Sequence, residues 1–355
     1  MTNSCFDPGT DEGDLSAALA TLADPFRRRL LSAAALTATG GALVATGIPL
    51  PSLAASAGRA AGAIHAFAGI PVSTADAVML PEGYAANLLY AWGDPISDGP
   101  RARADAGDDA AAQMQQAGMH HDGMHFFPFV ENGKPSSTHG LLCINHEYTD
   151  DGLLHSDGMQ DWSAGKVAKS KAAHGVSIIE IRRQKDGWQV VRPSLLARRI
   201  TADTPCRIGG PARGDEAMRT TTDQRGEFVL GTVNNCAMGA TPWGTYLTCE
   251  ENFNGYFKGP STPSADQKRY GLTENGFGFR WHEHDERFDA TRHPNEPNRF
   301  GWVVEIDPWH PEQAPVKRTA LGRFKHEGAT VTLARDGRAV VYMGDDERFE
   351  YVYKF

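Results

Sequence analysis

The sequence lacks several motifs that would identify common enzyme and binding classes. None of its five cysteines forms a Cys-x-x-Cys pair, which argues against a zinc ribbon or a thioredoxin-like site. A Gly-x-Ser-x-Gly nucleophile elbow and a phosphate-cradling P-loop are also missing, so the enzyme classes that depend on them are disfavoured. Basic residues are in deficit, with 35 Lys and Arg against 44 Asp and Glu. The resulting net charge of -9 argues against binding of a nucleic acid polymer or an anionic membrane surface.

The first 57 residues have the composition of an export signal. Three consecutive arginines, residues 27–29, precede a weakly apolar run, and residues 55–57 (Ala-Ser-Ala) supply a small-residue cleavage pattern. Glycine, threonine and two prolines interrupt the apolar run, so it is a poor candidate for a membrane-spanning helix. The sequence therefore predicts a twin-arginine signal peptide over residues 1–57 that is handled by the twin-arginine export machinery. We expect a periplasmic or secreted mature protein without a membrane span.

Export by this route bears on metal binding, because it carries proteins that have already folded in the cytoplasm. A metal or cofactor that must be loaded before export is a frequent reason for using it. The four cysteines that follow the leader are Cys143, Cys206, Cys236 and Cys249. In an oxidising compartment they allow one or two disulfides, whose connectivity the sequence does not determine.

The part of the chain after the leader is predicted to be one all-β domain. Residues 58–75 are rich in alanine and glycine and are interpreted as a linker, with the domain over residues 76–355. Strand-like runs, the first of them residues 83–94, alternate with turn signals, and long amphipathic helix patterns are scarce. Asp186-Gly187 and Asp336-Gly337 each stand between alternating apolar residues, which predicts two β-hairpins. This pattern favours a sandwich, barrel or propeller over a parallel sheet.

Two long segments interrupt the strand-like pattern. Residues 101–127 and 253–300 are rich in Gly, Asp, His and Pro, and we predict that they are extended loops. Loops on a rigid β scaffold are where binding and catalytic residues tend to lie.

Hard oxygen donors recur at the ends of the predicted strands. They are Asn145, Glu147, Asp150, Asn234, Asn235, Glu250, Glu251, Glu327, Asp345 and Asp346. Calcium, magnesium and iron(III) prefer carboxylate and amide oxygens, and several acids in one place repel each other unless cations neutralise them. One hypothesis is therefore a site for several cations. The alternative for each residue alone is a turn residue or a solvated strand end.

The stretch around residues 234–252 combines two amides, two thiols and two glutamates. Neighbouring strand residues face opposite sides of a sheet, so only one of Glu250 and Glu251 is expected to face a common centre, unless a bulge intervenes. Glu251 is our first choice. Cys236 has three open interpretations: a metal-binding thiolate, a small buried thiol, or one half of a disulfide with Cys143 or Cys249.

The histidines offer further candidates with weaker patterns. Residues 120–125 (His-His-Asp-Gly-Met-His) form a loose histidine cluster, but no acid or cysteine spacing completes a zinc motif. His146 and His326 each precede a glutamate, and they are more typical of structural histidines than of ligands.

Five segments of this chain occur together in a known family. They are CINHEYTD (143–150), GTVNNCAMGATPWGTYLTCEENFNGYF (231–257), NEPNRFGWVVEIDP (295–308), GRFKHEGATV (322–331) and VVYMGDDERFEYVYKF (340–355). In this order they resemble PhoX-type alkaline phosphatases, over roughly residues 76–355, and the twin-arginine leader agrees. The resemblance implies a six-bladed β-propeller with long inserted loops, which hydrolyses small phosphate monoesters with Fe(III) and Ca(II).

The resemblance also implies roles for individual residues. The iron ligands and catalytic residues would be Cys236, Glu251 and Glu327. The residues around the calcium ions would be Asn145, Glu147, Asp345 and Asp346.

One departure from the family affects the expected activity. The family continues well beyond the Gly-Asp-Asp strand and carries an Arg-Pro-Glu motif there, which this sequence does not contain. We therefore expect an N-terminal portion of the family fold with only its N-terminal blades. Two alternatives to an active phosphatase follow: a non-catalytic calcium-binding propeller fragment, or a calcium-propeller hydrolase of another ester class.

Overall fold

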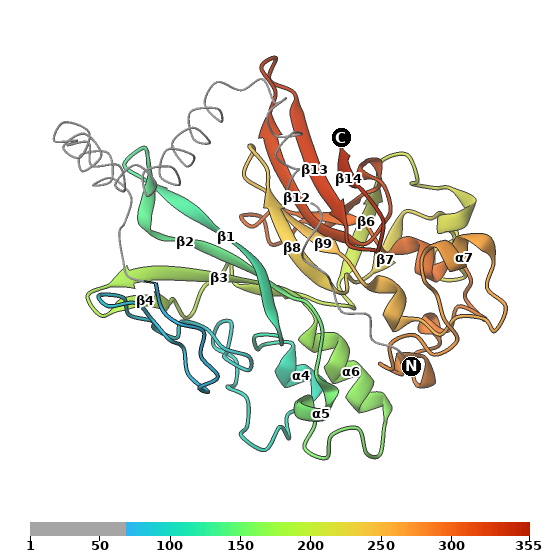
Figure 1. Cartoon of the computed structure of the whole chain (residues 1–355), viewed down its shortest axis with the longest axis horizontal. Helices are drawn as coiled ribbons and strands as arrows, with labels where there is room; N and C mark the ends of the chain where they lie inside the picture. The colour runs from blue at the N-terminus through green and yellow to red at the C-terminus, as the bar shows by residue number, and fades with distance from the viewer. Residues whose placement is uncertain (1–68) are drawn as a thin grey trace, which may run out of the picture. The chain divides into compact units, whose positions relative to one another are not determined.

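The computed structural model describes residues 69–355 of the chain (Figure 1). The predicted leader, residues 1–57, lies outside the described residues. The chain divides into two compact units, and the second, Asn87–Phe355, holds all the helices and strands described below. In the first unit, residues 69–86 form turns without a helix or strand. Within residues 69–355, every helix is too short or too polar to cross a membrane.

The second unit is built mainly from three β-sheets. The first has five strands, in the order β1-β2-β3-β4 with β5 also paired to β3: β1 (His121–Glu131), β2 (Lys134–His146), β3 (Gly175–Gln184), β4 (Gly187–Val190) and β5 (Arg198–Ile200). The second has six, in the order β7-β6-β11-β10-β9-β8: β6 (Pro205–Gly209), β7 (Phe228–Leu230), β8 (Asn235–Ala240), β9 (Tyr246–Glu250), β10 (Val303–Ile306) and β11 (Val316–Arg318). The third runs β12-β13-β14: β12 (His326–Leu333), β13 (Ala339–Asp345) and β14 (Val352–Lys354). Among the described strands, only β11 and β6 pair in parallel.

Helices are few and short. The α-helices of the described residues are α4 (Ala110–Gln113), α5 (Asp151–Leu154), α6 (Ala164–Ala173) and α7 (Ala265–Arg269). Single turns of 3-10 helix are η3 (Glu216–Met218), η4 (Phe253–Tyr256), η5 (Trp281–Glu283), η6 (Glu286–Phe288), η7 (Glu296–Arg299) and η8 (Thr319–Leu321). Helix α6 packs beside α4 (Figure 1). The side chain of Ser163 caps its start, and the buried Arg199 guanidinium donates to the carbonyl oxygens of Ala172 and His174 at its end.

The structure confirms both predicted hairpins and the mostly-β fold class. Strands β3 and β4 pair around Asp186-Gly187, and β12 and β13 pair around Asp336-Gly337, where Gly337 has φ +82°. Each sheet within residues 69–355 is open, since none closes on itself. The number of propeller blades therefore stays a prediction.

Two of the predicted local structures are wrong. Residues 83–94 form no strand: turns occur at both ends of the run, and Gly93 and Asp94 bond to the backbone of Ala117, outside any named strand. Residues 101–127, predicted as a loop, include α4 and the start of β1. The sequence His121–Glu131 pairs with β2, and this long-range pairing outweighs the loop-like local composition.

The long segment 253–300 contains no strand, as expected of a loop, but it includes α7 and the turns η4 to η7, and aromatic packing holds it. Its fully buried rings are those of Phe253, Tyr256, Phe257, Trp281, Phe288 and Phe300. Tyr256 stacks on Phe279 with ring centroids 4.2 Å apart. Burying a large apolar side chain contributes about 1.5–3 kcal/mol to stability. Such a cluster therefore stabilises a segment that lacks the hydrogen-bond ladders of a sheet.

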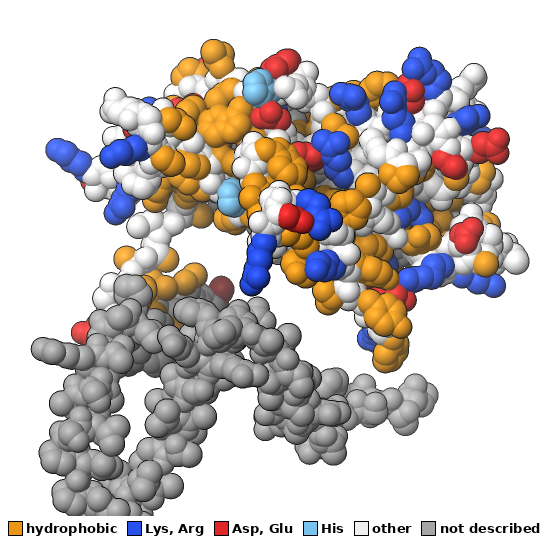
Figure 2. All heavy atoms as spheres, turned by 90° about the horizontal axis from the view of Figure 1, so that it is seen from above, with side chains coloured by type: hydrophobic (Ala, Val, Ile, Leu, Met, Phe, Trp, Pro, Cys, Tyr) orange, Lys and Arg blue, Asp and Glu red, His pale blue; other side chains and the backbone are white. Residues whose placement is uncertain are grey.

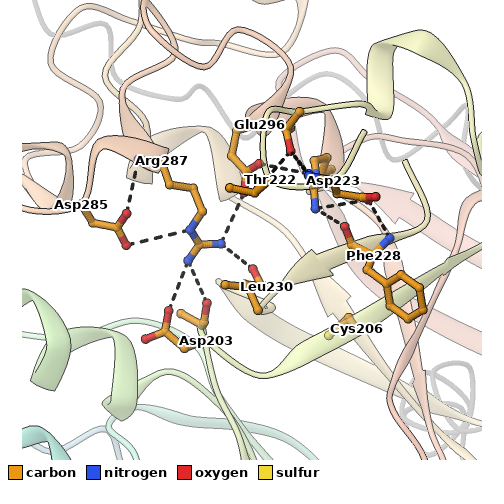
Figure 3. Close-up of polar contacts among 12 residues, drawn as sticks. Asp203, Cys206, Thr222, Asp223, Phe228, Leu230, Asp285, Arg287 and Glu296 are labelled. Carbon is orange, nitrogen blue, oxygen red and sulfur yellow. Dashed lines mark hydrogen bonds and ion pairs between the residues drawn. The ribbon is translucent and has the colours of Figure 1, made fainter. Parts of the chain in front are cut away.

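Arg287 links this segment to the six-stranded sheet (Figure 3). Its guanidinium donates to the carbonyl oxygens of Ala202 and Leu230, at 3.0 and 2.5 Å. The carboxylates around it belong to Asp203, Asp285 and Glu296. A single exposed pair contributes little to stability, but this group fixes one arginine between three separate parts of the chain.

Apolar side chains remain exposed on or next to the third sheet. They belong to Leu333, Tyr342, Tyr351, Val352 and Phe355. Figure 2 views the molecule from above relative to Figure 1, and hydrophobic side chains gather across the middle of that face. A cavity of about 280 Å³ lies beside Trp243, Val341 and Phe355. This sheet therefore presents an apolar surface that the described residues leave uncovered.

A buried ion pair joins the centre of the six-stranded sheet. The Lys317 ammonium on β11 lies 2.7 Å from Glu250 Oε1 on β9, and both side chains are fully buried. Glu250 Oε2 accepts hydrogen bonds from the backbone amides of Gly301 and Trp302, just before β10. The ammonium also donates to the Arg299 carbonyl oxygen at 2.9 Å. Because each charge is compensated, the pair holds β9, β10 and β11 in a single arrangement.

We predict that Lys317→Met lowers the free energy of unfolding by about 3–5 kcal/mol, because it leaves Glu250 charged and buried. Adding Glu250→Gln should recover part of this loss, since glutamine still accepts from the Gly301 and Trp302 amides. Urea-induced unfolding of the single and double variants measures both effects. A single variant as stable as the wild type would contradict the prediction.

Candidate metal centre

Cys236, at the start of β8, is the point where three distant segments meet. Its thiol sulfur lies 3.1 Å from Asp122 Oδ2 on β1 and 3.3 Å from Glu327 Oε2 on β12. The Cys236 side chain is buried, whereas Asp122 is half-buried and Glu327 is exposed. The site therefore reaches from the sheet interior to solvent.

Cys236 belongs to two groups of potential metal ligands. One group is Asp122, Glu147 and Cys236, and the other is Cys236, Glu251 and Glu327. Within each group the ligand atoms lie within 4.8 Å of one another. A thiol and four carboxylates thus share one small region. Such a donor set suits metals that accept both sulfur and oxygen ligands.

Three of these residues lie in β-bulges. Asp122 lies where two residues of β1 oppose one of β2, between the pairs His121–His146 and Met124–Ile144. Cys236 occupies the corresponding irregularity between β8 and β9, and Glu327 that between β12 and β13. A bulge adds one residue to a strand and redirects its side chain. Each bulge therefore turns a potential ligand toward the same point.

Small residues allow the bulged strands to approach closely. A Cβ atom on Gly123 would lie 2.9 Å from the backbone of Ala237, next to Cys236. A Cβ atom on Gly239 would lie only 1.9 Å from the Ala329 carbonyl oxygen on β12. Strands β1 and β12 can therefore both pack on β8, which is what brings Asp122 and Glu327 to the thiol.

The structure separates the two neighbouring glutamates. Glu250 points to Lys317 in the core, whereas Glu251 joins the cluster just after the end of β9. Glu251 Oε2 accepts a hydrogen bond from the side chain of Asn252, but Glu251 Oε1 is buried and has no hydrogen-bond partner in the structure. A buried carboxylate oxygen without a partner is costly, and a cation at this position would remove the cost.

Three groups of the cluster, Glu147, Cys236 and Glu251, have raised pKa values. Burial, together with the charges of Asp346 and Glu147, raises the pKa of Glu251 to about 8. Burial and the neighbouring Asp122 raise the pKa of Glu147 to about 7. Burial and the hydrogen bond to Asp122 also raise the pKa of the Cys236 thiol far above its usual range. Without cations, the ionised forms of these groups are therefore unfavourable. Bound metal cations would stabilise those forms, so these residues fit a metal centre.

The remaining residues predicted as metal ligands lie around the cluster. Asn145 is buried, and its amide nitrogen donates to the carbonyl oxygens of Cys236 and Ala237, while its oxygen accepts from the hydroxyls of Tyr246 and Thr248. It therefore braces β2 against β8 and β9, and its expected place near a calcium ion stays a prediction.

The acidic pair at the end of β13 also lies outside the two groups. The Asp345 carboxylate lies 4.0 Å from the Arg269 guanidinium. Asp346 is exposed, and its negative charge contributes to the raised pKa of Glu251. Asp346 is therefore close enough to Glu251 to affect its charge.

Sequence analysis missed Asp122 as a candidate ligand. It stands inside the His-His-Asp-Gly-Met-His run, whose histidines are the more obvious candidate ligands. The signal that was available is an acid followed by glycine at the start of an alternating run, which is compatible with a bulge. His146 and His326 are buried, and Nε2 of each is hydrogen-bonded, to Ser177 and to the Gly322 carbonyl oxygen, while Nδ1 of each has no partner in the structure.

The cysteines settle one of the alternatives for Cys236. All four cysteines of the described residues are buried and unpaired. The disulfide interpretation of Cys236 is therefore wrong, and the interpretations as a metal ligand and as a buried thiol remain. Burial raises the pKa values of the Cys143 and Cys249 thiols, which makes both unreactive.

Known proteins resemble this chain over most of its described length. The family described as Alkaline phosphatase PhoX matches residues 65–355. This chain belongs to the PhoX alkaline phosphatase family. A solved structure, described as Pseudomonas fluorescens PhoX in complex with vanadate, a transition state analogue, is 49% identical to it, with a TM-score of 0.78. The match covers 81% of this chain and 50% of that one, so this chain spans about half the length of the solved PhoX protein. No curated protein matches the chain.

The raised pKa of Glu251 predicts that the metal-free protein becomes less stable as the pH rises from about 4.5 to about 8. Between these values the folded chain keeps a proton that the unfolded chain has lost, so a higher pH favours unfolding. Glu251→Gln removes this titration, and its Tm should fall less steeply over the same range. Thermal unfolding with a chelator present measures both slopes. Equal slopes in the two proteins would contradict the assigned pKa.

Proposed function

We propose that this chain acts in the hydrolysis of phosphate monoesters as a metal-dependent alkaline phosphatase. The observation that carries the proposal is the convergence of four carboxylates and one thiol, three of them in β-bulges, in a member of the PhoX family. The related solved structure holds vanadate, described as a transition state analogue, and this supports a phosphate-like group as the ligand.

Charge explains why metal ions are needed for this function. The two ligand groups together hold four carboxylates and one thiol, and the carboxylates would repel a phosphate dianion. When bound, metal cations supply positive charge for the phosphate oxygens and lower the pKa of water. The residues of the chain contribute the negative charge that retains the cations and the geometry that sets their positions.

The donor atoms favour two kinds of metal. Cys236, Glu251 and Glu327 would hold iron(III), because a thiolate with carboxylates suits iron better than calcium. Glu147, together with Asp122, offers carboxylate oxygens of the kind that calcium prefers. Metal binding requires the Cys236 thiol to release its proton, so the affinity for metal should rise with pH.

Three further properties are part of the proposal. The protein is exported by the twin-arginine machinery to the periplasm or beyond, and its sheets belong to a propeller arrangement. Its substrates are small phosphate monoesters rather than nucleic acid polymers, in keeping with the net charge of -9.

Elemental analysis of the purified chain, paired with hydrolysis of a chromogenic phosphate monoester, tests the function. We expect stoichiometric iron and calcium, together with turnover that a chelator abolishes and that the two metals restore. A lactone substrate serves as the comparison for another ester class. Protein that contains neither metal and hydrolyses neither ester would contradict the proposal.

Glu327→Gln should lower both the iron content and the phosphatase activity, because a neutral amide replaces an anionic ligand. We expect a loss of more than about 100-fold in activity, beyond the 10–100-fold that removing a residue behind the ligands costs. Glu131→Gln, at the far end of β1, is the matched control and should behave as the wild type. Retention of both iron and activity in Glu327→Gln would refute the assignment of this residue.

A further inference from the structure

Asn234 lies directly behind Glu251 and has an unusual backbone conformation. Its φ is +49°, in the left-handed region, and the residue is only 4% exposed. Non-glycine residues seldom adopt this conformation, although asparagine tolerates it better than most. The residue immediately precedes β8, two positions before Cys236. Its conformation therefore fixes the direction of the backbone at the start of β8, just before the bulge that contains Cys236.

Asn234 holds the backbone that carries Glu251. Its carbonyl oxygen accepts a hydrogen bond from the Glu251 amide at 2.9 Å. Its side-chain oxygen accepts another from the Asn252 amide at 2.5 Å. Two consecutive amides just after β9 are therefore bound by a single residue, which fixes the direction in which the Glu251 side chain leaves the backbone.

Asn252 then fixes the carboxylate itself. Its side-chain nitrogen donates to Glu251 Oε2, whereas Glu251 Oε1 has no partner. One oxygen is thus held by the protein, and the other is left for a cation within the group that includes Cys236 and Glu327. This is the arrangement by which outer hydrogen bonds orient a metal-binding carboxylate.

Buried aromatic residues anchor the asparagine from behind. The Asn234 side-chain nitrogen donates to the Tyr256 hydroxyl at 3.3 Å, and that hydroxyl is also 2.9 Å from His174 Nε2. Tyr256 is buried and stacked on Phe279. Asparagine is suited to this position because its side chain accepts and donates at once. Aspartate would lack the donor, and glycine would lack both groups.

We propose that Asn234 and Asn252 are positioning residues that aim Glu251 Oε1 at the metal cations. This inference rests on the proposed metal-dependent function. Asn234 then acts through the Asn252 backbone amide, from which its side-chain oxygen accepts a hydrogen bond, and Asn252 acts through the side-chain nitrogen that holds Glu251.

Cobalt(II) titration of the full chain, stripped of metal by a chelator, tests the proposal. Cobalt bound to a thiolate gives a charge-transfer absorption in the near ultraviolet, so the titration reports both the affinity and the Cys236–metal contact. Asn234→Gly keeps the left-handed backbone and deletes only the side chain. Asn252→Ala deletes the donor to Glu251 Oε2. We expect each variant to bind cobalt about 10–100-fold more weakly than the wild type.

Two further variants make the outcomes separable. Asn298→Ala removes a side-chain bond to the Ala217 carbonyl oxygen, outside the cluster, and should bind cobalt as the wild type does. Glu251→Gln removes the ligand and should bind at least as weakly as Asn234→Gly. The apo Tm of each variant shows whether it is folded, and Asn252→Ala supplies the test if Asn234→Gly is not.

The results distinguish this inference from the proposed function. If Glu251→Gln binds weakly but the folded Asn234→Gly and Asn252→Ala bind within twofold of the wild type, the positioning role is refuted and the metal site stands. If the wild type binds no cobalt, or Glu251→Gln binds it equally well, Glu251 is not a metal ligand. The inference then fails together with the proposed site.

Discussion

The buried contact between Lys317 and Glu250 is the constraint on which the centre of this structure depends. It joins β9 to β11, and Glu250 also receives the two amides that precede β10. Breaking this pair would leave an unpaired charge in the protein interior, which costs several kcal/mol. Strand β9 therefore keeps the face that carries Glu250 turned toward Lys317. Because successive residues alternate, the side chain after Glu250 is directed away from the ion pair. That residue is Glu251, which carries the buried oxygen of the metal centre.

The metal centre is made by irregularities in otherwise regular sheets. Asp122, Cys236 and Glu327 each lie in a bulge, and each belongs to a different sheet. Glycine close to these positions lets the strands approach until their backbones touch. A regular ladder would direct each of these side chains by strict alternation. The extra residue in each strand instead lets one side chain from each of the three sheets reach the same point. Each bulge interrupts the hydrogen bonds of its ladder locally.

Local sequence patterns predicted a considerable part of this architecture. Asp-Gly pairs marked the β3–β4 and β12–β13 hairpins, because such pairs favour the backbone conformation of a tight turn. The scarcity of helical periodicity indicated a mostly-β fold. Residues 83–94 and the start of β1 were predicted wrongly, since the presence of a strand depends on a pairing partner that local composition does not reveal.

The sequence by itself determined the donor types, the acidic charge, the turn positions and the resemblance to a phosphatase family. Only the tertiary structure decided which donors meet. It brought Asp122 to Cys236, turned Glu250 into the core and used the Asn145 amide as a brace. The physical reason is that ligand geometry depends on bulge positions and on interstrand packing. Both are set by contacts between residues about 90 to 115 positions apart, which no local pattern records.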